Sequence, residues 1–148
     1  MSLEVFALNE SHRTAWQPLA EGYKEFYKTV TSKDEYEVAW CKLMSGTEVH
    51  GLGASADGEM VGFAHYLFHT STWAPKICYL QDMFTAPHAR GRGIARELIR
   101  EVADRARAAG AVRYYWLTQE SNAVARVLYD RVAKFNGFIR YDYSLNDA

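Results

Sequence analysis

The sequence predicts an α/β protein with a mixed β-sheet, folded as one domain over residues 1–148, and three observations support this prediction. A chain of 148 residues fits one domain with a sizeable core. Its hydrophobic period changes between the 3.6 residues of a helix and the two residues of a strand. Glycine or proline stands at many of these changes. The elements are therefore expected in the order β-α-α-β-β-β-α-β-α-β.

Each element can be assigned a range. The first half of the chain is expected to contain a strand, two helices and a hairpin, and the second half alternates strands and helices. The expected ranges are a strand over 3–8, helices over about 14–27 and 34–44, strands over 49–56 and 60–68 around an Asp57-Gly58 turn, a strand over 77–85, a helix from Ile94, a strand over 112–118, a helix over 122–135 and a last strand over 138–145.

Several boundaries carry capping signals. Ser11 has the side chain of an N-cap for the first helix. Pro18 is then expected in the first turn, where proline is tolerated. Ser32 and Glu35 have the spacing of a capping box at the start of the second helix. Gly110 is expected to end the helix that begins at Ile94.

Two later helices show an apolar stripe at three- and four-residue spacings, which predicts the face that each one buries. In the first of them the stripe consists of Ile94, Leu98, Ile99, Val102 and Ala106. In the second it consists of Val124, Leu128, Val132 and Phe135.

Composition narrows the function classes. The net charge is −1, so bulk electrostatics gives no reason to expect nucleic acid or an anionic membrane as a partner. No apolar run is long enough to span a bilayer, and no secretory signal is recognisable. Cys41 and Cys78 lie far apart without metal-ligand spacing. We therefore expect a reduced, cytoplasmic protein without a bound metal.

Residues 79–96 combine a strand, a glycine-rich loop and a helix start. Pro87 ends the strand, because proline has no N–H for the ladder. Two glycines and two arginines then occupy residues 90–95, directly before the helical pattern. A helix N-terminus presents unpaired N–H groups and a partial positive charge. This order predicts a phosphate or pyrophosphate site, although the loop matches neither a Walker motif nor the three-glycine dinucleotide fingerprint.

The loop resembles the Gln/Arg-x-x-Gly-x-Gly/Ala signature of the GCN5-related N-acetyltransferase (GNAT) superfamily. The matching residues are Arg90-Gly91-Arg92-Gly93-Ile94-Ala95, supported by Leu80-Gln81-Asp82-Met83-Phe84, Tyr115-Trp116-Leu117-Thr118, Asn122, Leu128-Tyr129-Asp130 and Gly137-Phe138. Within that superfamily the chain is similar to the branch that acetylates polyamines, other small amines and sometimes histone tails. The resemblance implies the GNAT fold, with splayed fourth and fifth strands, and an acetyl-CoA-dependent N-acetyltransferase.

The resemblance also assigns cofactor-binding residues. The loop amides would hold the pyrophosphate of acetyl-CoA, and the end of the central strand would pair with the pantetheine arm. A backbone N–H near Phe84 would polarise the acetyl carbonyl. The residues implied are Met83, Phe84, Thr85, Arg90, Gly91, Arg92, Gly93, Ile94, Ala95, Arg96 and Asn122.

Tyr129 is the candidate general acid that would protonate the departing thiolate. It lies two helical turns beyond Asn122, on the same face and roughly 10 Å away. Proton transfer from a phenol of pKa about 10 to a thiolate whose acid has a pKa of about 8.5 is mildly uphill. The alternative is that Tyr129 only packs against its surroundings, and the family resemblance favours catalysis.

The general base is open. An alkyl ammonium of pKa near 10.4 must lose a proton before it can attack. Family members that carry a glutamate place it where this chain has Gln81 or Leu117. Asp82 is the catalytic candidate on the central strand, although it could instead make a structural hydrogen bond. The other candidates are Glu120, His65 (which could be a satisfied core histidine), His69 and a chain of water molecules.

The acceptor is expected to be a small cationic amine. Residues 1–48 carry eight acidic and five basic side chains, whereas residues 90–113 carry seven arginines against three acids. This polarity favours a cation on the acidic side, unless the charges are simply solvated helix faces. Aromatic residues could wall the amine site, although at helical spacing they could equally belong to the core; they are Tyr23, Tyr27, Trp40 and Trp73.

The sequence thus favours an N-acetyltransferase for a polyamine or an amino-acid-like amine, and by resemblance a homodimer. A protein N-terminus or a lysine side chain is the alternative acceptor. A non-catalytic acyl-CoA-binding module is a second function class, since the family glutamates are missing. An RNA-binding protein is a third, but a single Arg-Gly-Arg-Gly run at net charge −1 gives it little support.

Overall fold

A computed structural model describes residues 1–146. The chain divides into two compact units, Met1–Leu117 and Thr118–Ala148. The first unit contains β1 (Leu3–Ala7), the 3₁₀ helix η1 (Glu10–His12), α1 (Arg13–Phe26), α2 (Lys33–Ser45), β2 (Val49–Ala56), β3 (Glu59–His69), β4 (Ile77–Thr85), the 3₁₀ helix η2 (Pro87–Ala89), α3 (Ile94–Ala108) and β5 (Arg113–Trp116). The second contains α4 (Ala123–Val132).

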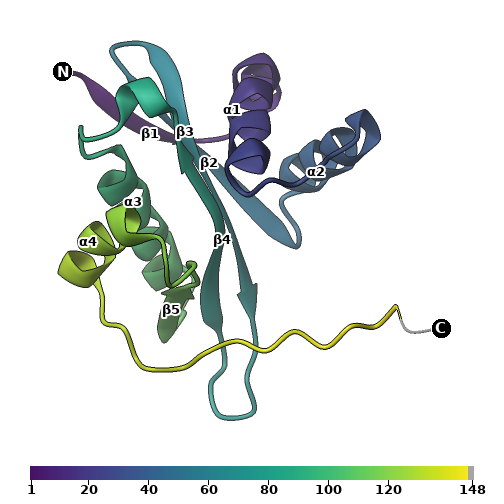
Figure 1. The fold of residues 1–148 in the computed structure, drawn as a ribbon, viewed down its shortest axis with the longest axis vertical. Helices are drawn as coiled ribbons and strands as arrows, with labels where there is room; N and C mark the ends of the chain where they lie inside the picture. Colours follow the sequence, from purple (N-terminus) through teal and green to yellow (C-terminus); the bar gives the residue numbers. More distant parts are fainter. Residues whose placement is uncertain (147–148) are drawn as a thin grey trace. The chain divides into compact units, whose positions relative to one another are not determined.

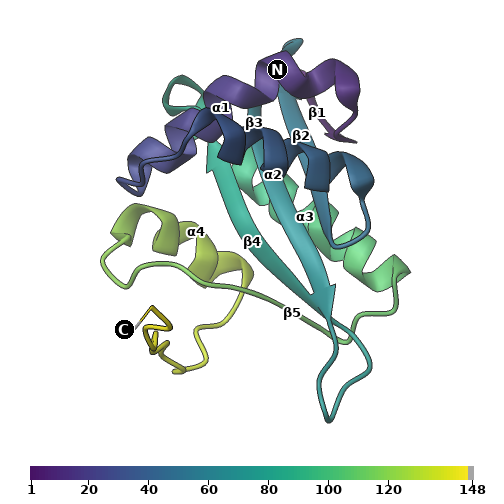
Figure 2. The ribbon, with the colours of Figure 1, turned by 90° about the vertical axis from the view of Figure 1, so that its right-hand side faces the viewer.

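The first unit is a three-layer α/β sandwich. Its five strands lie in the order β1-β2-β3-β4-β5, and only the β4–β5 pair is parallel. The helices α1 and α2 cover one face of the sheet, and α3 covers the other (Figures 1 and 2). A mixed sheet of this kind confirms the predicted fold class.

The helix α3 buries the stripe that its spacing predicts. Ile94, Leu98, Ile99, Val102 and Ala106 are each at most 6% exposed. Gly110 has φ +84° and follows the helix end, as a C-terminal glycine should. The capping box at Ser32 and Glu35 is also confirmed, with both of its hydrogen bonds formed.

The start of the first helix differs from the prediction. Asn9, not Ser11, provides the cap: its side chain accepts a hydrogen bond from the Ser11 N–H, and Ser11 itself lies inside η1. Because α1 begins at Arg13, Pro18 lies beyond the first turn. It therefore has no N–H to give the carbonyl of Thr14, and the helix tolerates this defect.

The strands β4 and β5 separate, as the family resemblance implies. The pairing joins Ile77 through Leu80 of β4 to Arg113 through Trp116 of β5. Within the described residues, β4 continues to Thr85 without a partner on that edge. The strand predicted over 112–118 is therefore shorter than expected, and half of β4 keeps an open edge.

The second unit departs most from the prediction. The helix α4 ends at Val132, and none of its residues is buried; Val124 is 87% exposed and Phe135 is 64% exposed. The strand expected over 138–145 is not formed. Alternating side chains are compatible with a strand, but a strand also needs a neighbouring backbone to bond with, and this segment forms no such ladder.

Candidate active site

A β-bulge at Gln81 shapes the open half of β4. His65 of β3 lies opposite Asp82, but the next residue, Tyr66, lies opposite Leu80. Gln81 is therefore the extra residue on β4. A bulge bends its strand and shifts which face the following side chains occupy. It stands where β4 parts from β5, and it places Asp82 on the face covered by α1.

The open edge of β4 presents the backbone groups of Met83 and Thr85. The Ala86 N–H donates to the Val61 carbonyl on β3, at 2.7 Å. Backbone groups alternate along a strand, so those of Phe84 also point to β3, whereas those of Met83 and Thr85 point to the open edge. The backbone N–H expected near Phe84 to polarise the acetyl carbonyl is therefore that of Met83 or Thr85, not that of Phe84 itself. An extended ligand could add here as a strand would.

The glycine-rich loop has the backbone shape that the sequence suggests. Gly91 and Gly93 have φ +78° and +84°, which residues with a side chain rarely adopt. Gly93 is the N-cap of α3, and no side chain caps the helix. The space beside either glycine is open, because an added Cβ would meet nothing within 4 Å. The amides of Ile94, Ala95 and Arg96 are thus available to an anion.

Positive charge without a local partner is concentrated at this loop. Within the described chain, Arg92 and Arg96 are exposed and make no ion pair. The later arginines of α3 are paired with acids of the same helix: Arg100 with Glu97 and Asp104, Arg105 with Glu101, and Arg107 with Asp104. The loop and the first turn of α3 therefore fit a pyrophosphate in both shape and charge.

Arg90 links the loop to β4. Its Nε donates to the Thr85 carbonyl at 3.1 Å, and its guanidinium lies 5.6 Å from the Phe84 ring centre and 5.9 Å from that of Phe26. These contacts fix the loop against the strand end and against α1. Among the predicted cofactor-binding residues, the structure brings Met83, Thr85 and residues 90–96 together in one unit.

On the α1 face, Asp82 is the centre of a hydrogen-bonded cluster. Tyr23 OH donates to its Oδ1 at 2.8 Å, and His65 Nδ1 lies 3.0 Å from its Oδ2. Trp16 Nε1 donates to His65 Nε2 at 3.1 Å. Gly22 lets α1 approach this region, because a Cβ there would lie 2.9 Å from the Phe84 ring.

These bonds set the charge of Asp82. Burial raises the pKa of its carboxyl group, but the bonds from His65 and Tyr23 outweigh burial and hold the pKa below its ordinary value. Burial and the adjacent carboxylate raise the pKa of Tyr23. Asp82 is therefore a carboxylate at neutral pH with both oxygens engaged, which favours the structural alternative over the role of general base.

The histidines are also engaged. His69 Nε2 lies 3.0 Å from Tyr115 OH, and its Nδ1 lies 2.9 Å from the Thr70 carbonyl. His65 has both ring nitrogens in the Asp82 cluster. Neither histidine has a free nitrogen that could receive a proton from an amine.

Asn122 and Tyr129 belong to the second unit. Asn122 occupies the N-cap position of α4 and donates to the Thr118 hydroxyl at 3.2 Å. Tyr129 is half-buried, two turns further along the helix. Both lie on one helix, as predicted, and their roles toward acetyl-CoA stay predictions.

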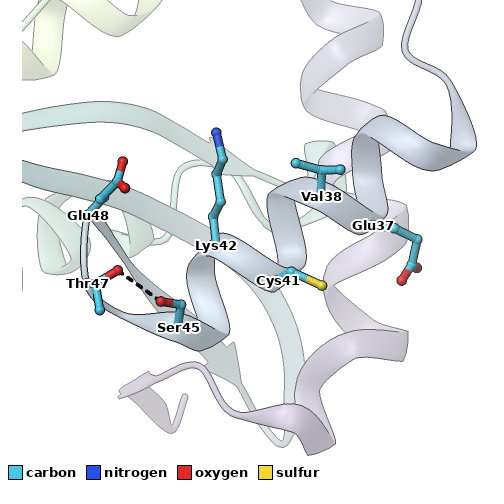
Figure 3. A pocket seen from close by; sticks show the side chains of 7 residues that line it. All are labelled: Glu37, Val38, Cys41, Lys42, Ser45, Thr47 and Glu48. Carbon is cyan, nitrogen blue, oxygen red and sulfur yellow. Dashed lines mark hydrogen bonds between the residues drawn. The ribbon is translucent and has the colours of Figure 1, made fainter.

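A hollow lies beside α2 in the first unit (Figure 3). It is lined by Glu37, Val38, Cys41, Lys42, Ser45, Thr47 and Glu48. None of these belongs to β4 or to the glycine-rich loop, so we do not assign the hollow to the acetyl-CoA site.

Two further findings concern residues 1–146 as a whole. They contain no group of three or more His, Cys, Asp and Glu side chains placed to bind a metal ion. None of their helices is both long and apolar enough to cross a membrane.

The sequence did not reveal the part that Trp16 plays. Trp16 is buried on α1, and the partner of its N–H is a strand residue far along the chain. A buried tryptophan needs an acceptor for that N–H. The sequence therefore indicates that Trp16 needs an acceptor, but it does not identify His65 as that acceptor.

Comparison with known proteins identifies the class. The sequence matches the Acetyltransferase (GNAT) family over residues 16–135. It is 34% identical to the D-amino-acid N-acetyltransferase HPA3 of Saccharomyces cerevisiae, over 87% of this chain and 83% of that protein. It is 27% identical to the thialysine N-epsilon-acetyltransferase of Caenorhabditis elegans, over 91% and 84% of the two chains.

Solved structures share the fold. An aminoglycoside acetyltransferase, AAC(6')-Iy in complex with a bisubstrate analogue, has a TM-score of 0.85 at 18% identity, over 97% of this chain and 99% of that one. The ribosomal-protein-alanine N-acetyltransferase of Brucella melitensis has a TM-score of 0.82 at 21% identity, over 97% and 100%.

The chain therefore belongs to the GNAT acetyltransferase family. It is an acetyl-CoA-dependent N-acetyltransferase, with acetyl-CoA as the co-substrate. This membership argues against the non-catalytic acyl-CoA-binding module and the RNA-binding protein.

Proposed function

We propose that the enzyme acetylates a small cationic primary amine, either a polyamine or an amino-acid-like amine. The observation that carries this proposal is the Asp82 carboxylate, which adjoins Met83 in β4 and lies on the α1 side of the sheet. A fixed anion beside the acetyl site attracts a cation. The relatives named for D-amino acids and for thialysine also act on small amines.

In this proposal the main chain binds the co-substrate. The amides that begin α3, with Arg92 and Arg96, hold the pyrophosphate. Met83 and Thr85 hold the pantetheine arm along the open edge of β4, and one of their N–H groups donates to the acetyl carbonyl oxygen. Acetyl-CoA supplies the thioester carbon that the amine attacks.

Tyr129 acts as general acid. As the new C–N bond forms and the C–S bond breaks, the Tyr129 hydroxyl gives its proton to the departing sulfur. Asn122, on the same helix, would bind the pantetheine arm. The amine passes its own proton to water rather than to Asp82 or the two histidines, which are already engaged, and Glu120 is the remaining side-chain candidate. Gln81 and Leu117, where the family resemblance places a glutamate in some members, cannot accept that proton.

We further propose that residues 1–148 work as one GNAT domain, that the enzyme is a cytoplasmic homodimer, and that it needs no metal. Light scattering on the purified chain tests the dimer. A mass near twice the 16.9 kDa of one chain supports it, and a mass equal to one chain refutes it.

The test of the proposed function follows thiol release from acetyl-CoA with a panel of amines. The panel contains spermidine, 1,3-diaminopropane, D-lysine and a lysine-containing peptide. Cys41 is exposed, so a Cys41→Ser background removes its contribution to the thiol signal. Burial raises the pKa of Cys78 to about 11, so this thiol stays protonated and does not react with the thiol reagent. Turnover with the small amines supports the proposal, and turnover with the peptide alone would favour the protein acetyltransferase.

We predict that Tyr129→Phe lowers turnover by about 100-fold or more while CoA affinity stays within a factor of about two, because only the proton donor is lost. Tyr141→Phe, which changes a tyrosine that is 87% exposed in the same unit, is the matched control and should leave both quantities unchanged. An unaltered turnover in Tyr129→Phe would remove this residue from the mechanism.

A further inference from the structure

We propose that Asp82, held by Trp16 and His65, selects acceptors with two amino groups by binding the one that is not acetylated. This inference rests on the proposed function and names the acceptor class: short diamines and basic amino acids rather than monoamines. Asp82 is then the specificity-determining residue, and Trp16 and His65 are positioning residues.

The direction of the hydrogen bonds follows from Trp16. The indole N–H can only donate. Its 3.1 Å bond therefore makes His65 Nε2 an acceptor, without a proton. The proton of the neutral imidazole then lies on Nδ1, which donates to Asp82 Oδ2 at 3.0 Å. Tyr23 donates to the other oxygen. One buried tryptophan thus fixes the tautomer of His65 and the position of the carboxylate.

Exposure increases along this chain of bonds. Trp16 is 1% exposed, whereas the side chains of His65 and Asp82 are 12% and 28% exposed. The chain begins in the core and ends at a carboxylate that solvent reaches. A carboxylate oxygen can accept more than one hydrogen bond, so an ammonium can still bind where Asp82 is exposed.

No second carboxylate shares this position. The titratable and charged side chains that act on Asp82 and Tyr23, besides His65, are Lys24 and Tyr27 on α1 and Tyr79 on β4. β2 places Gly51 opposite His65, and Arg13 lies over the Trp16 ring 5.2 Å from its centre. Asp82 is therefore the one negative group of the cluster within residues 1–146.

The bound group must differ from the reacting group. A carboxylate in contact with an ammonium stabilises the charged form, which cannot attack a thioester. If Asp82 held the reacting amine, it would oppose the required deprotonation. Binding a second ammonium avoids this conflict and directs the other end of the acceptor to the open edge of β4.

Trp16 also keeps His65 oriented toward Asp82. In Trp16→Phe the Nε2 atom loses its donor. His65 can then turn or take the other tautomer, so that Asp82 loses the donor at Oδ2 and its fixed position, and diamine binding weakens.

The first experiment compares 1,3-diaminopropane with butylamine, in which a methyl group replaces one amino group. We expect the wild-type kcat/KM for the diamine to be about 30-fold higher than that for butylamine. Asp82→Asn should lose this preference through a higher KM for the diamine, while its kcat stays within about threefold of the wild-type value. A large fall in kcat at unchanged KM would instead identify Asp82 as the base and overturn the proposal. Equal use of both amines by the wild type would also overturn it, while leaving the proposed function intact. Acetylation of no amine would refute the proposed function itself.

The second experiment needs no turnover. Nitrogen-15 spectra of the imidazole groups in the wild-type protein should show His65 as the Nδ1–H tautomer, which the bond from Trp16 requires. Diamine affinity, measured by calorimetry at one fixed pH, should be several-fold weaker in Trp16→Phe than in the wild type. Tyr66→Phe is the control and should leave diamine affinity unchanged, because Tyr66 is a buried aromatic residue of β3 that stacks on His50 rather than on Trp16. The Nε2–H tautomer in the wild type, or an unchanged diamine affinity in Trp16→Phe, would refute the positioning role.

Discussion

Asp82 shows how its neighbours decide what a carboxylate can do. From sequence it was a candidate base, because it lies on the central strand of the predicted fold. The structure surrounds it with two donors, one on each oxygen. A carboxylate held in this way is a good anion and a poor proton acceptor. The residue type was visible in the sequence, but its role depended on two partners from other elements.

The same bonds make a prediction about stability. The pKa of Asp82 is lowered in the folded protein, so its contribution is present above the unfolded pKa of about 3.9 and is lost as the pH falls through the folded value. At pH 7, Asp82→Asn should therefore lower the free energy of unfolding by about 2 kcal/mol, and below about pH 4 this difference should shrink. Urea unfolding at pH 7 and at pH 3 measures both values. A difference that does not depend on pH would contradict the assignment.

Elements were predicted better than the contacts between them. Helices and strands follow local periodicity, and the stripe of α3 was correct at every position. The bulge at Gln81 was not predictable, because it depends on how two distant strands pair. Counting residues back from the loop between β3 and β4 pairs His65 with Gln81, and the observed partner is Asp82. A single extra residue thus decides which side chain faces α1.

The second unit and the start of α1 show what a local sequence pattern alone cannot predict. The Asn122–Tyr129 helix was found where expected, since its spacing is local. The expected last strand has the right side chains but no backbone partner. The predicted positions of Pro18 and Ser11 at the start of the first helix were wrong for a related reason. The 3₁₀ helix η1 precedes α1, and such a short turn leaves no clear periodicity in the sequence.

The glycine-rich loop allows a prediction about a single structural element. Gly93 has φ +84°, so Gly93→Ala should destabilise the fold by about 1–2 kcal/mol and distort the amides that begin α3. We expect about tenfold weaker CoA binding. Gly46→Ala is a matched control: Gly46 has φ +62° at the end of α2, and a Cβ there also meets nothing within 4 Å. Thermal unfolding and calorimetry should show similar destabilisation in both variants and weaker CoA binding in Gly93→Ala alone. Equal affinities would exclude the loop from the site.

At the scale of the whole molecule, the two units contribute different things. Among the described residues, every buried apolar side chain lies at or before Ala106, so the first unit holds the core. It also holds the loop, the open edge of β4 and the Asp82 cluster. The second unit holds Asn122 and Tyr129, the residues proposed to bind pantetheine and to protonate the thiolate. The proposal thus assigns pyrophosphate binding to the first unit, proton transfer to the second, and pantetheine binding to residues of both.

The central claim is that acetyl-CoA lies on the main chain at the start of α3 and along the open edge of β4. Amide ¹H–¹⁵N spectra recorded while CoA is added to the wild-type protein test it most directly. We predict that the amides of residues 91–96, Met83 and Thr85 shift most, and that those of residues 37–45 in α2 do not move. Binding without shifts at these loop and β4 amides, or with the largest shifts in α2, would contradict the account.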